Sequence, residues 1–139
     1  MLKDFLVIKT VLQFIIPYIV LYAFYIQLNG EVSPGGGFQA GVIFASGLIA
    51  YSLIFGIEKL VQIFSIKQLT YIAISGVALY TLTGILSLIQ GGQYLDYSLL
   101  ASSPILGQHL GIFLIEVGVG LTVSSVMCLI YIKLSEEYA

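Results

Sequence analysis

The chain of 139 residues has very little charge. Only 9% of its residues are charged, arginine and tryptophan are absent, and histidine and cysteine each occur once. Soluble domains carry about 25% charged residues. With 59% hydrophobic residues and a mean hydropathy of +1.06, this composition is that of an integral membrane protein.

The same scarcities exclude several classes of function. Without arginine, and with five scattered lysines, nothing in the chain predicts nucleic-acid binding. The single cysteine, Cys128, excludes an internal disulfide and a cysteine-based metal site. The sequence has no Walker motif and no Ser/His/Asp set with catalytic spacing. We therefore expect no cofactor, no metal site and no enzymatic activity.

Four apolar runs are each long enough to cross a bilayer, which takes about 20 residues. They cover residues 10–28, 38–57, 68–89 and 108–132. The sequence therefore predicts one domain over residues 1–139, with an all-α fold. We expect an integral membrane bundle of four transmembrane helices.

The lysines predict the orientation of this bundle. All five lie before the first run, between the second and third, or after the fourth: Lys3, Lys9, Lys59, Lys67 and Lys133. Because lysine is enriched in cytoplasmic segments, both termini are predicted to be cytoplasmic, an N-in/C-in topology. The connections around residues 29–37 and 90–106 are then outside.

A Pro-Gly segment in the first outer connection is the most specific motif. It consists of Pro34, Gly35, Gly36 and Gly37, followed by Phe38. Proline fixes its own φ angle, and glycine permits positive φ and close approach of another backbone. A loop that only joined two helices would not need this combination, so we expect a structural role for the motif.

Small residues also recur inside the second and fourth runs. Gly37 is followed by Gly41 and Ala45 at four-residue spacing, which lets another helix approach closely. The fourth run carries Gly118 and Gly120. We expect these residues to pack helices together, with a neighbour either in this chain or in another subunit.

Glu116 is the one acidic residue well inside an apolar run. Counted from Gln108 at 1.5 Å per residue, it lies about 12 Å deep, near mid-membrane. Carboxylates at such depth face a partner or a water-filled cavity. Glu116 therefore handles a proton or cation, or it pairs with a polar group of another subunit. His109, seven residues earlier on the same face, either lines the same path or is an interfacial histidine. Both alternatives remain open.

The motifs together resemble the MnhB/MrpB family, whose members are subunits of multisubunit Mrp-type Na+/H+ antiporters. The family motif Gly-His-x-x-Pro-Gly-Gly-Gly-Phe corresponds to residues 30–38, with Glu31 in place of the histidine. An acid followed by glycine and valine in the last span corresponds to residues 116–120.

The resemblance implies an accessory subunit of a monovalent cation/proton antiporter in the bacterial plasma membrane. Its partners would be the other subunits, with Na+ and H+ as the transported ions, and Glu116 and His109 are the ion-path candidates. Two alternatives remain: a structural subunit of a hydrogenase-type complex, and a self-contained four-span exporter.

Overall fold

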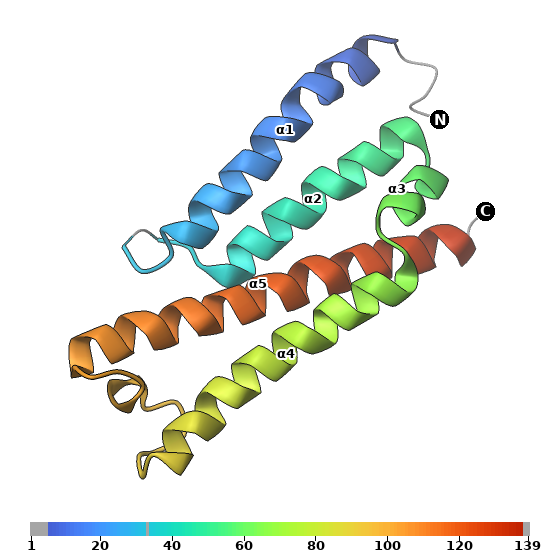
Figure 1. Ribbon diagram of the computed structural model, residues 1–139. Helices are drawn as coiled ribbons and strands as arrows, with labels where there is room; N and C mark the ends of the chain where they lie inside the picture. Colours follow the sequence, from blue (N-terminus) through green and yellow to red (C-terminus); the bar gives the residue numbers. More distant parts are fainter. Residues whose placement is uncertain (1–5, 33, 138–139) are drawn as a thin grey trace.

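The computed structural model describes residues 6–32 and 34–137, and its long elements are all helices (Figure 1). Four are long and apolar enough to cross a membrane: α1 (Leu6–Leu28), α2 (Gly37–Phe55), α4 (Ile66–Ile89) and α5 (Pro104–Glu137). The predicted all-α fold with four spans is therefore confirmed. Two short helices, α3 (Ile57–Ile63) and the 3-10 helix η2 (Tyr97–Leu99), were not predicted.

The long helices lie side by side in the order α1, α2, α5, α4 (Figure 1). The last helix of the chain is thus inserted beside α2 and α4. Figure 1 also shows that the α1–α2 loop and the loop after α4 lie at one end, and α3 at the other. At the α3 end, the ammonium groups of Lys9 and Lys59 lie 5.9 Å and 5.4 Å from the centre of the Phe55 ring. The segments that bear Lys9 and Lys59 therefore share one end of the molecule, whereas Lys3 lies outside the described residues.

Which end is cytoplasmic remains a prediction. In a Cys128→Ser background, we expect Val32→Cys to react with a membrane-impermeant maleimide added to intact cells, because Val32 is 90% exposed at the loop end. Gln62→Cys on α3 is the matched control and should react only after the cells are opened. The reverse pattern would contradict the N-in/C-in topology. Ser33, which neighbours Val32, lies outside the described residues.

Glycines on two sides of α5 let both neighbours approach it. A Cβ atom added to Gly41 of α2 would lie 2.8 Å from the carbonyl oxygen of Gly120. A Cβ atom added to Gly118 would lie 2.8 Å from the carbonyl oxygen of Gly76 on α4. Since these contacts reach backbone, a larger residue would force the helices apart. The neighbour of the α2 small-residue ladder is therefore α5 of the same chain.

A core of buried side chains lies nearer the lysine-bearing end. Its members come from α2, α3, α4 and α5: Ala45, Leu60, Leu69, Cys128 and Ile132. Leu60 links α3 to the long helices, which explains why the connection between α2 and α4 is helical. On α4, a capping box between Ser65 and Gln68 begins the helix.

The connection between α4 and α5 is held against α5. Gly107 and Gly111 face the backbone and ring of Tyr97, so that η2 packs on the first turns of α5. The Asp96 carboxylate accepts hydrogen bonds from the backbone and hydroxyl of Ser98 and caps η2.

Burial, followed by the nearby Tyr80 and Tyr94, raises the pKa of Tyr97. Its hydroxyl therefore stays protonated at neutral pH.

Candidate functional site

The Glu116 side chain lies against the loop between α1 and α2. A Cβ atom added to Gly36 would lie 3.0 Å from Oε1 of Glu116, and one added to Gly30 would collide with Oε2. Both contacts depend on the absence of a side chain at these positions. Gly30, before the Pro-Gly motif, and Gly36, within it, thus form a cradle for the carboxylate.

Each of the three glycines of the motif is required for a different structural reason. Gly35 has a φ angle of 143°, which side-chain-bearing residues rarely adopt. The backbone of Gly36 is nearly extended, a conformation that any residue can adopt. A side chain at this position would instead crowd the Glu116 carboxylate. Gly37, the first residue of α2, lies directly against the backbone carbonyl of Glu116, where a Cβ atom would collide. Pro34 and Phe38 are exposed. The motif thus joins the start of α2 to α5 at the position of the acid.

Glu31 and His109 connect the same loop to α5 a second time. His109 Nδ1 lies 3.0 Å from both carboxylate oxygens of Glu31. The His109 side chain is 62% exposed and that of Glu31 is 28% exposed. The sequence suggested no role for Glu31, although it is the acid in the loop that faces the only histidine of the chain. The pair lies at the rim of the Glu116 cradle.

Glu116 has no positively charged partner within the described part of the chain. The ion pairs found there are His109–Glu31 and Lys133–Glu136, and neither includes Glu116. Glu31 lies close enough for the two carboxylates to repel each other. Residues 6–32 and 34–137 also contain no cluster of three or more His, Cys, Asp and Glu residues suited to a metal ion. A charge on Glu116 is therefore not balanced by an ion pair among these residues.

The depth of Glu116 in the membrane stays a prediction. It was counted from Gln108, but α5 has 34 residues and measures about 50 Å at 1.5 Å per residue. That exceeds the hydrocarbon thickness of about 30 Å. Because Glu116 contacts Gly36 and Gly37, it lies level with the beginning of α2 and not halfway along it. The first three turns of α5 extend beyond that level.

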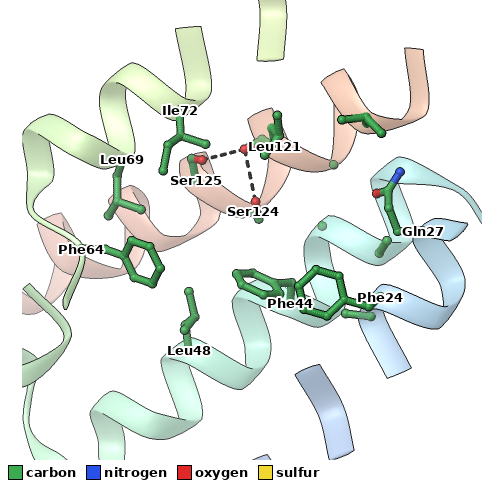
Figure 2. Close-up of a pocket in the computed structure, with 15 residues that line it drawn as sticks. Phe24, Gln27, Phe44, Leu48, Phe64, Leu69, Ile72, Leu121, Ser124 and Ser125 are labelled. Carbon is green, nitrogen blue, oxygen red and sulfur yellow. Dashed lines mark hydrogen bonds between the residues drawn. The ribbon is translucent and has the colours of Figure 1, made fainter. Parts of the chain in front are cut away.

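A cavity of about 350 Å³ lies among the long helices (Figure 2), and it is lined on α5 by Val117, which directly follows Glu116, and by Gly120. Most of its lining is aliphatic or aromatic: Phe24, Phe44, Leu48, Phe64, Leu69 and Ile72. The hydroxyls of Ser124 and Ser125 donate to the Leu121 carbonyl, as the dashed lines in Figure 2 show. Both are therefore already satisfied. This cavity offers few groups to an ion.

Gln27 is the polar exception at this cavity, and the sequence analysis missed it. Its Oε1 atom lies against Gly120, one turn from Glu116, and its Nε2 atom is buried without a hydrogen-bond partner. Such a donor is costly to leave unsatisfied. The available signal was a glutamine inside the apolar run of residues 10–28.

Comparisons with known proteins identify relatives of this chain. Residues 7–129 match the family described as a domain related to the MnhB subunit of Na+/H+ antiporter. The B subunit of the Na(+)/H(+) antiporter of Bacillus subtilis (strain 168) is 29% identical over 128 residues, covering 85% of this chain and 89% of that protein. The putative antiporter subunit mnhB2 of Staphylococcus aureus (strain Newman) is 30% identical over 138 residues, 97% of either chain.

The family match thus includes α1, α2, α4 and most of α5, together with the Pro-Gly motif and Glu116. Both relatives named above are matched over nearly their full length. This chain belongs to the family of domains related to the MnhB subunit of Na+/H+ antiporters.

Proposed function

We propose that this chain is an accessory subunit of a multisubunit Na+/H+ antiporter in the bacterial plasma membrane. The observation that carries the proposal is the placement of Glu116. Among the described residues its carboxylate has no cationic partner, and it lies against Gly30 and Gly36 of the α1–α2 loop. The family membership and the four membrane-length helices support the same function.

Glu116 would act at the outer end of an ion path that other subunits complete. Its carboxylate is partly exposed, next to Glu31 and the exposed His109. Negative charge at the mouth of a path attracts cations. His109 and Glu31 would hold the loop in place and set the local charge around Glu116.

The accessory role is supported by the surroundings of the part of α5 that follows Glu116. The neighbouring cavity is apolar, and its two serine hydroxyls are bonded to backbone. An ion needs polar groups or water along its whole route. The lining of this cavity offers no such route, so we expect transport to require other subunits. This argues against a self-contained exporter.

Purification of the assembled protein tests the function. An affinity tag on this chain should recover a membrane complex from native membranes, and that complex in proteoliposomes should exchange Na+ for H+. The chain alone, at the same protein-to-lipid ratio, should give no cation-dependent proton flux. Flux from the pure chain would favour the exporter. Recovery with redox subunits and without antiport would favour the hydrogenase-type complex.

A further inference from the structure

Helix α1 carries an aromatic face that nothing in the described part of the chain covers. Phe14, Tyr18, Tyr22 and Tyr25 recur at three- or four-residue spacing and are 70%, 70%, 52% and 55% exposed. We call this set the tyrosine face. The rings of Tyr22 and Tyr25 are stacked, with centroids 6.2 Å apart. In the apolar 18-residue stretch of α1, only 6% of the residues are buried, compared with 33% in the corresponding stretch of α2.

The position of Tyr18 along α1 sets it apart from an ordinary membrane tyrosine. It lies 12 residues after Leu6 and 10 residues before Leu28, or about 18 Å and 15 Å from the two helix ends. Tyrosines are enriched at the membrane–water interface, where the ring is buried and the hydroxyl is wet. Tyr18 is near the middle of the span, where no water is available to its hydroxyl.

The surroundings of two other tyrosines differ from those of Tyr18. Tyr71 is 71% exposed, but it lies only five residues from the start of α4, at the interface. Tyr131 faces inward, and its hydroxyl accepts a hydrogen bond of 2.7 Å from Ser52 Oγ. The hydroxyls of Tyr18 and Tyr22 make no hydrogen bond within the described residues. A polar group without a partner in an apolar environment is unfavourable.

We infer that the tyrosine face binds a transmembrane helix of another subunit, one that presents a hydrogen-bond acceptor to Tyr18 near mid-membrane. A lipid acyl chain offers no acceptor at that depth. A helix offers Ser, Thr, Asn or Gln side chains, and such residues join membrane helices. Aromatic side chains are also the typical anchors of protein interfaces. The inference rests on the proposed function, because it requires a multisubunit complex.

Photo-crosslinking in the assembled complex tests the surface directly. With p-benzoylphenylalanine in place of Tyr18, irradiation should join this chain to one other subunit, identified by mass spectrometry. The same probe in place of Tyr71, which is equally exposed, should yield no such product. A product of twice the mass of this chain, or lipid adducts alone at position 18, would overturn the inference. A crosslink to a subunit of a different complex would support the surface and overturn the antiporter assignment.

The hydroxyl itself is tested by Tyr18→Phe, which keeps the ring and its packing. Hydrogen bonds between membrane helices contribute about 0.6–1.7 kcal/mol, so subunit dissociation should become roughly 3- to 20-fold more favourable. The measurement is the fraction of partner subunit retained on the tagged chain over a detergent titration. Tyr71→Phe is the matched control and should behave as wild type. Equal retention by Tyr18→Phe and wild type would show that the hydroxyl has no partner.

Discussion

A Gly37→Ala variant is expected to lose nearly all assembled complex. The added methyl group would collide with the backbone carbonyl of Glu116, and backbone cannot move aside as a side chain can. Overpacking of this kind costs about 1–3 kcal/mol and occasionally more. We expect the upper end, because α2 would have to move away from α5 along the contact that also includes Gly41 and Gly120. The measurement is the amount of tagged chain recovered with its partner subunits.

Gly36→Ala is the matched comparison within the motif. Its methyl group would meet the end of the Glu116 side chain at 3.0 Å, and a flexible side chain can adjust. We therefore expect assembly to be largely preserved, while transport decreases because the carboxylate is displaced. Normal assembly of Gly37→Ala would show that the approach of α2 to α5 is not needed. Equal loss of assembly in both variants would assign the effect to loop conformation in general.

A Glu116→Gln variant is expected to lower antiport more than any other acid substitution in the chain. Glutamine has nearly the same shape and fits the cradle of Gly30 and Gly36, so that only the charge and the titratable proton are lost. Interactions with a charged group contribute about 1.5–3 kcal/mol, which corresponds to roughly a tenfold to hundredfold lower rate. Glu116→Asp should retain part of the activity. The measurement is cation-dependent proton flux in proteoliposomes over a range of pH.

Glu136→Gln provides the control on the same helix. Glu136 lies at the opposite end of α5, where it is exposed and accepts a hydrogen bond of 2.8 Å from Lys133. Exposed pairs of this kind contribute at most about 1 kcal/mol, so we expect an unchanged rate. Only complexes with a full set of subunits are compared, since Glu116 also touches the loop. A wild-type rate and pH profile for Glu116→Gln would leave this carboxylate a structural role alone.

The role of each motif glycine illustrates the limit of sequence reasoning. Proline followed by three glycines predicted a structural loop, because this composition permits unusual backbone conformation and close approach. The sequence did not tell which glycine meets which constraint. The structure assigns positive φ to Gly35, contact with the carboxylate to Gly36, and contact with backbone to Gly37. These assignments depend on the position of α5, which is 79 residues further along the chain at Glu116.

The sequence by itself determined the four helices, their apolar surfaces, the grouping of lysines and the family. Each of these is a property of consecutive residues, and a bilayer demands helices whose backbone is bonded within the segment. Only the tertiary structure decided the neighbours of α5, the level of Glu116 relative to α2, the contact of Gln27 with Gly120 and the pairing of Glu31 with His109. These depend on how far one helix is shifted along another. That shift is set by contacts between residues distant in the chain, which hydropathy along a single helix does not contain.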